Sequence, residues 1–174
     1  MTIPERLPIS ARQILRAATE EDIPAMVNFE RIPEFRTMVG NWPAAEHLRA
    51  LGDPDMRYFM VIDENGAAAG FAILRGLLSS HRNIELKRFV IGRPGTGLGQ
   101  QALHALMDHV FSGLHAHRLW LDVFETNARA QHVYRKAGFR QEGILREAIY
   151  RDGEFHSLLL MSLLDREYLS GGVP

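Results

Sequence analysis

The spacing of apolar residues predicts alternating strands and helices, beginning with a short strand over residues 13–17. Thr19 is typical of a helix N-cap, because acidic residues fill the turn that follows it. Ile23, Met26 and Val27 then fall on one face of the predicted helix. The chain is therefore expected to enter its fold through a strand and an amphipathic helix.

The pattern of apolar positions continues to the C-terminal part of the chain. The further predicted elements are a helix over 44–50, strands over 57–63, 67–75 and 83–91, a helix opening at 95–99, a strand over 118–124, a helix over 127–137, and a final hairpin from 139 that turns at 151–153 and returns over 158–164. The order β-α-α-β-β-β-α-β-α-β-β predicts an α/β (α+β) fold, antiparallel at first and with a parallel crossover later. We expect one domain over 13–168, an N-terminal arm over 1–12 and a frayed tail over 169–174.

Composition narrows the class of protein. The chain has 174 residues, 46% of them hydrophobic, which suits one domain with a core of its own. The absence of cysteine excludes disulfide scaffolds, thiolate metal sites and a cysteine nucleophile. A net charge of −1 argues against a protein that grips nucleic acid directly. Because no apolar segment suits a signal peptide or a membrane span, we expect a cytoplasmic protein without membrane contact.

A glycine-rich segment from Ile91 to Gln101 follows a predicted strand and opens a predicted helix. Glycines allow an anion to approach the backbone closely, and the first N–H groups of the helix would point at it. A P-loop would need a lysine after the last glycine, and a dinucleotide fingerprint would need glycine in place of Gln100. Taken alone, the segment fits either a phosphate site or an unliganded turn.

A second segment runs from Asn127 to Phe139 and places a helix directly after a predicted strand. Asn127 can cap this helix or bind a ligand amide, and Tyr134 lies on its apolar face. Each residue alone is explained by a purely structural role.

Together, the two segments resemble the GNAT superfamily of acyl-CoA N-acyltransferases. Residues 92–101 resemble its pyrophosphate loop, written Q/R-x-x-G-x-G/A, and residues 127–139 resemble its N-x-x-A-x-x-x-Y-x-x-x-G-F segment. The resemblance covers roughly residues 13–165 and implies the GNAT fold, with a mixed, mostly antiparallel sheet flanked by helices. Pro94 departs from the pattern, since it occupies the Q/R position and has no N–H, with Arg93 one residue early.

The resemblance implies acetyl-CoA as co-substrate, bound without a metal. It places the binding residues at Phe89, Val90, Ile91, Arg93, Gly95, Thr96, Gly97, Leu98, Gly99, Gln100, Asn127, Ala130 and Tyr134. The backbone of Phe89 and Ile91 would pair with the pantetheine as an added strand does. Because cysteine is absent, direct transfer in a ternary complex is the simplest route.

Two residues are candidates for catalysis. Tyr134 matches the family's usual general acid for the departing thiolate. Glu85 is the candidate general base; alternation along its strand puts it on the face of Lys87 and Phe89. A structural role for Glu85, paired with Lys87 or Arg88, is an equal alternative.

The C-terminal half indicates the group of acceptors. Residues 138–147 and 150–161 resemble the Rim-type group, which includes N-terminal acetyltransferases of ribosomal proteins and spermidine acetyltransferases. This implies a primary amine acceptor, in a pocket built by residues 29–43, where Glu34 is one acidic candidate, and by the last hairpin.

Other functions remain open at this point. One is an acyl-CoA-binding sensor or partner protein that has lost catalysis, and another is a nucleotide-binding domain. His115 and His117 have no carboxylate at ligand spacing, so a metal site is not favoured. We expect a monomer or a homodimer.

Overall fold

The computed structural model describes residues 14–171. The strands are β1 (Leu15–Ala17), β2 (Met56–Ile62), β3 (Ala68–Arg75), β4 (Asn83–Ile91), β5 (Arg118–Phe124), β6 (Arg140–Arg151) and β7 (Glu154–Leu164). The helices are α1 (Ile23–Glu30), α2 (Ala44–Leu51), α3 (Leu98–Asp108), α4 (Ala128–Lys136) and α5 (Asp165–Leu169). A 3-10 turn, Glu20–Asp22, precedes α1, and a π-helical turn, His109–Gly113, extends α3.

The strands form one seven-stranded sheet in the order β1-β2-β3-β4-β5-β7-β6. Every neighbouring pair is antiparallel except β4 and β5. This arrangement confirms the predicted fold class and element order. The expected arm over 1–12 lies outside the described residues, as do the first residue of the predicted 13–17 strand and residues 172–174 of the expected tail.

Two apolar clusters lie on opposite faces of the sheet. The larger packs α3 and α4 against the sheet, and its centre includes Leu103, Leu106 and Leu121. The smaller packs α1 and the end of α2 on the other face, around Met26 and Phe71. Burying each of these side chains contributes about 1.5–3 kcal/mol, so the helices are held on the sheet mainly by these two layers.

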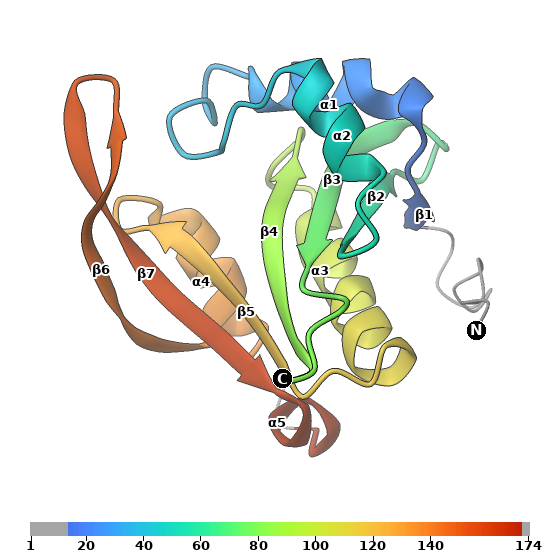
Figure 1. The fold of residues 1–174 in the computed structure, drawn as a ribbon, viewed down its shortest axis with the longest axis vertical. Coiled ribbons are helices and arrows are strands. Elements are labelled where there is room, and N and C mark those ends of the chain that lie inside the picture. The colour runs from blue at the N-terminus through green and yellow to red at the C-terminus, as the bar shows by residue number, and fades with distance from the viewer. Residues whose placement is uncertain (1–13, 172–174) are drawn as a thin grey trace.

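The two central strands diverge. β4 pairs with β5 only through its first three residues, at Asn83–Arg118, Ile84–Leu119 and Glu85–Trp120. Beyond these pairs β4 follows β3 as far as Ile91, while β5 follows β7 as far as Phe124. Figure 1 shows the two strands opening into a V. The facing edges of β4 and β5 are therefore left without a strand partner along the opening.

A β-bulge at Lys87 changes the faces of β4. Ile73 is opposite Arg88, but the next residue of β3, Leu74, is opposite Leu86, so Lys87 is extra. Alternation restarts after the bulge. Phe89 consequently packs in the α3 and α4 layer with Leu86, and the prediction that Glu85 shares a face with Phe89 is wrong.

The last helix, α5, was not predicted. It occupies residues that the sequence pattern assigned partly to the domain end and partly to a frayed tail. Its first turn is held by the Glu167 carboxylate, which accepts from the Leu164 N–H at 3.0 Å, and by Asp165, 3.1 Å from His117 Nδ1. Tyr168 stacks on Phe111 with ring centroids 5.0 Å apart. A helix of five residues has too few turns to give a periodic signal.

Among the helices described, none combines the length and apolarity that crossing a bilayer requires.

Candidate active site

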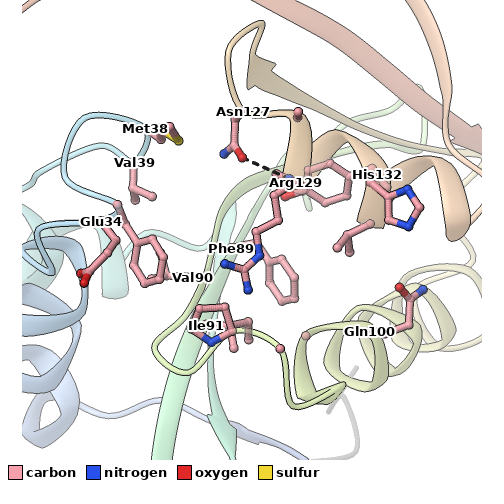
Figure 2. Close-up of a pocket in the computed structure, with 18 of the residues that line it drawn as sticks. Glu34, Met38, Val39, Phe89, Val90, Ile91, Gln100, Asn127, Arg129 and His132 are labelled. Atoms are coloured by element: carbon pink, nitrogen blue, oxygen red, sulfur yellow. Dashed lines mark hydrogen bonds between the residues drawn. The ribbon is translucent and has the colours of Figure 1, made fainter.

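A cleft of about 820 Å³ occupies the opening between β4 and β5. Its sides are the end of β4, the glycine loop with the start of α3, and the exposed face of α4. The remaining side is formed by Glu34, Phe35, Met38 and Val39, which lie between α1 and α2 and are called the α1–α2 wall below. Figure 2 shows Met38 and Val39 on the opposite side of the cleft from Gln100 and His132.

The glycine loop has the backbone shape that anion binding requires. Gly95 and Gly97 have φ angles of +85° and +78°, a region that L side chains rarely adopt. α3 begins at Leu98, and the first backbone bond of the helix is donated by Gln101 N–H to the Gly97 carbonyl at 3.2 Å. Within residues 14–171 no acceptor is recorded for the N–H groups of Gly99 and Gln100. These two donors, with the positive end of the helix, are available to an anion in the cleft.

Two of the predicted loop residues do not face this cleft. Thr96 and Leu98 line a second hollow, of about 530 Å³, on the other side of the loop. The Thr96 hydroxyl donates to the Arg93 carbonyl at 3.2 Å and is 3.4 Å from Leu98 N. Thr96 therefore stabilises the loop from the side that faces away from the cleft. Arg93 lines both hollows.

The end of β4 forms one side of the cleft. Phe89, Val90 and Ile91, which the family resemblance places among the cofactor-binding residues, all line it. Because β5 has turned away at this level, the β4 edge can accept an extended ligand in the way that a sheet accepts another strand.

Asn127 stands at the junction of β5 and α4. Its side-chain oxygen accepts from the Ala130 N–H at 3.1 Å, which caps α4 and is drawn in Figure 2. Gln131 fixes the same junction by donating to the carbonyls of Phe124 and Glu125 at 3.0 and 2.8 Å. The cap uses only the oxygen of Asn127, so its NH₂ group can serve a ligand.

Tyr134 lies in the cleft and is only 8% exposed. Burial raises the pKa of its hydroxyl well above the ordinary value, and the nearby negative charge of Asp122 raises this pKa further. The hydroxyl therefore keeps its proton throughout the neutral range. Tyr134 can act as a proton donor but not as a resident base.

Glu85 is not among the residues that line the cleft. It is 4% exposed and forms ion pairs with Arg75 on β3 and with Lys87, whose Nζ is 3.6 Å away. Its cross-strand neighbours are Arg75 and Trp120, at the closed end of the V. This geometry favours the structural alternative for Glu85 over the role of general base.

Part of the cleft was not predicted from the sequence. Arg129, His132 and Lys136 line the cleft from α4, and their spacing of three and four residues places them on one helical face. Helical periodicity could have identified them. The α1–α2 wall has no such signal, because its residues lie in irregular turns, although Glu34 was a candidate for the acceptor pocket.

The two histidines considered as metal ligands lie in the segment that leads into β5. His117 Nδ1 is 3.1 Å from a carboxylate oxygen of Asp165, and His115 has a φ of +53° in the turn before β5. In the part of the chain that is described, no group of three His, Asp or Glu side chains is arranged to hold a metal ion.

Comparison with known proteins decides the family. A family model described as "Acetyltransferase (GNAT) domain" matches residues 12–140. The chain belongs to the GNAT acetyltransferase family. Because the match contains both the glycine loop and α4, the family assignment covers most of the cleft.

The relatives of this GNAT chain include enzymes named for spermidine and for the ribosome. Spermidine N(1)-acetyltransferase of Escherichia coli is 31% identical over 111 residues, which is 63% of this chain and 60% of that protein. The putative ribosomal N-acetyltransferase YdaF of Bacillus subtilis is 28% identical over 151 residues, 81% of this chain and 82% of that protein. The present chain therefore aligns with less than two thirds of the E. coli protein's length.

Solved structures show the same architecture. Spermidine N-acetyltransferase from Vibrio cholerae, in complex with CoA and spermine, superposes with a TM-score of 0.80. The alignment covers 89% of this chain and 96% of that chain, at 25% identity. This similarity confirms that the chain has the expected GNAT fold over most of its length.

Proposed function

We propose that this chain is an acetyl-CoA-dependent N-acetyltransferase that transfers the acetyl group directly to a primary amine. The observation that carries the proposal is the V between β4 and β5, which has anion-binding N–H groups at one end and the Tyr134 hydroxyl inside it. Family membership supports the same reading.

The residues present fit acetyl-CoA. The pyrophosphate suits the N–H groups of Gly99 and Gln100, and the cationic side chains of Arg93, Arg129 and Lys136 line the same cleft. Pro94 also lines the cleft but brings no N–H, so the loop relies on the donors that follow Gly97. The unpartnered edge of β4 offers Phe89 and Ile91 to the amide groups of the pantetheine arm, with the Asn127 NH₂ on the opposite side.

In the proposed acetyl transfer, Tyr134 carries out one proton transfer. When bound, acetyl-CoA supplies an activated acetyl thioester. As the amine nitrogen bonds to the acetyl carbon and the carbon–sulfur bond breaks, the Tyr134 hydroxyl donates its proton to the leaving sulfur. The amine releases one proton to solvent, and Tyr134 then regains one, so the exchange balances. The raised pKa of Tyr134 keeps the donor protonated before each turnover.

The acceptor is a primary amine, either a small amine or a peptide α-amine. One relative is named a spermidine N(1)-acetyltransferase and another a putative ribosomal N-acetyltransferase, and both names support an amine acceptor. The α1–α2 wall faces the β4 edge and carries one carboxylate, Glu34, with three apolar side chains. We assign this wall to the amine, since the glycine loop and α4 serve the donor.

Calorimetric titration with acetyl-CoA tests the donor site, with ATP and NAD as matched phosphate-bearing controls. We expect saturable binding of acetyl-CoA and no comparable binding of either control. Selective binding of ATP or NAD would instead indicate a nucleotide site in the glycine loop. Binding of acetyl-CoA without turnover across a broad amine panel would favour an acyl-CoA-binding sensor over an enzyme.

A further inference from the structure

The side chain of Arg151 joins the hairpin of β6 and β7 to the α1–α2 wall by hydrogen bonds. This residue ends β6, and it lies more than a hundred positions from the wall in the sequence. Its Nη1 atom donates to the backbone carbonyls of Thr37 and Val39, at 2.9 and 3.0 Å. Both acceptors belong to the turn that carries Met38 and Val39 into the cleft.

The same guanidinium also reaches the other arm of the V. Its central carbon lies 5.1 Å from the centroid of the Phe124 ring, which is within cation–π range. Phe124 is the last residue of β5, two residues before Thr126, which lines the cleft. Arg151 therefore connects the α1–α2 wall to the end of β5 across the mouth of the V.

The wall has little regular structure to hold it in place. Its own backbone bonds are local, from the N–H groups of Met38 and Val39 to the Phe35 carbonyl at 2.7 and 2.9 Å. The segment is anchored on its C-terminal side, where the Trp42 N–H donates to the buried Glu30 carboxylate at 2.9 Å. Between that anchor and α1, the long-range hydrogen bonds recorded to residues 34–39 come from Arg151.

We propose that Arg151 is a positioning residue for the acceptor amine. It acts through the α1–α2 wall, holding Phe35, Met38 and Val39 where they can contact the apolar body of the amine. The proposal rests on the proposed function, because it takes the wall as the acceptor side. It implies that a change at Arg151 alters the KM of the amine and leaves acetyl-CoA binding unchanged.

Kinetics of three variants separate this role from a general structural one. The acceptor measured is phenethylamine, a primary amine with an apolar body. Arg151→Ala is expected to raise the KM of phenethylamine about tenfold, the scale of a lost charge-assisted hydrogen bond. The KM of acetyl-CoA should not change. Arg151→Lys keeps one charged donor and should recover part of the loss. Arg146→Ala removes an exposed arginine from the same strand and should change neither constant. A parallel rise in both KM values, or no rise in either, would overturn the proposal.

Hydrogen exchange provides a readout that does not depend on activity. The backbone amides of residues 35–39 should exchange several-fold faster in Arg151→Ala than in the wild type or in Arg146→Ala, because the wall loses its tie to the hairpin. Unchanged exchange in this segment would refute the positioning role. If exchange increases but the wild type acetylates no amine, the proposed function fails while the structural tie stands.

Discussion

In the proposed reaction, Tyr134 is the residue on which the chemical step depends most directly. We expect Tyr134→Phe to lower kcat about a hundredfold, the scale of a lost general acid, while the Kd of acetyl-CoA changes little. Tyr150→Phe is the matched control, because Tyr150 is an exposed tyrosine on the hairpin. Steady-state kinetics and calorimetry measure the two effects. Unchanged turnover in Tyr134→Phe would refute the role of this hydroxyl as proton donor.

Alanine substitution at Gly95 tests the role of the glycine loop in ligand binding, and the same substitution at Gly66 controls for the backbone strain that a positive φ causes. Gly95 and Gly66 have φ angles of +85° and +80°, and an added Cβ would meet no atom within 4 Å at either position. Alanine should therefore cost each site about 1–2 kcal/mol of stability from backbone strain. Only Gly95→Ala should also weaken acetyl-CoA binding, as measured by calorimetry. Equal affinities in the two variants would argue against the loop as the pyrophosphate site.

Glu85 is assigned a structural role by its ion pairs. Glu85→Gln should lower the free energy of unfolding by about 1 kcal/mol, a modest loss because the partner Arg75 is 46% exposed. Its kcat and the shape of its pH–rate profile should match the wild type. Both profiles should rise with pH as the acceptor amine loses its proton, without a decline in the range where the raised pKa of Tyr134 keeps its hydroxyl protonated. A rate loss confined to low pH would restore Glu85 as general base.

At this scale the sequence predicts residue positions well only where local geometry is regular. Gly95, Asn127 and Tyr134 reach the cleft because a turn, a cap and a helical face each fix their direction. The prediction that Glu85 shares a face of the strand with Phe89 was wrong, because one extra residue, Lys87, reverses the alternation of β4. A bulge depends on the partner strand, so the pattern of a single strand does not reveal it.

At the scale of elements, a buried ion pair joins α1 to β4. Glu30 is fully buried at the end of α1, with Arg88 Nε 3.1 Å from one carboxylate oxygen and His47 Nε2 3.3 Å from the other. The Arg88 guanidinium also lies 4.8 Å over the Trp42 ring and directly against Gly40, where no Cβ would fit. The pair thus fixes the chain that leads out of the α1–α2 wall.

Removing one partner of this pair should be costly. Glu30→Ala leaves the Arg88 charge buried and unpaired, and we expect a loss of about 3–5 kcal/mol in the free energy of unfolding by denaturant titration. Glu21→Ala, an exposed glutamate just before α1, is the control and should change stability little. Adding Arg88→Met to Glu30→Ala should recover part of the loss. If the double variant were less stable than Glu30→Ala, the account of an unpaired buried charge would be wrong.

Most elements were predictable because their apolar periodicity is strong. β5 was predicted with its observed bounds, and α4 was predicted to within one residue at each end. Residues 29–43, which contain the α1–α2 wall, and the last hairpin were expected to build one pocket. The Arg151 contact between them was not predictable, because it joins a side chain to backbone carbonyls far away in the sequence. Periodicity reports which face of an element is buried, but not which distant loop a side chain will reach.

For the whole molecule, the splayed sheet gives the proposed enzyme one cleft for two substrates. In the proposed arrangement acetyl-CoA lies on the side of α3 and α4 and the amine on the side of α1 and α2, so that the reacting groups meet between β4 and β5. The motif pair predicted the donor side through a family resemblance, which the family-model match confirms. The acceptor side rests on irregular segments, and its chemistry stays a proposal.

The central claim is that acetyl transfer depends on an amine. Its most direct test is the rate at which free CoA thiol appears when the protein is mixed with acetyl-CoA and a pool of primary amines containing small monoamines, a polyamine and a peptide. The account predicts thiol release only when amines are present, in equal amount to acetylated amine found by mass spectrometry. Release at the same rate without amine, or no release with any of them, would contradict it.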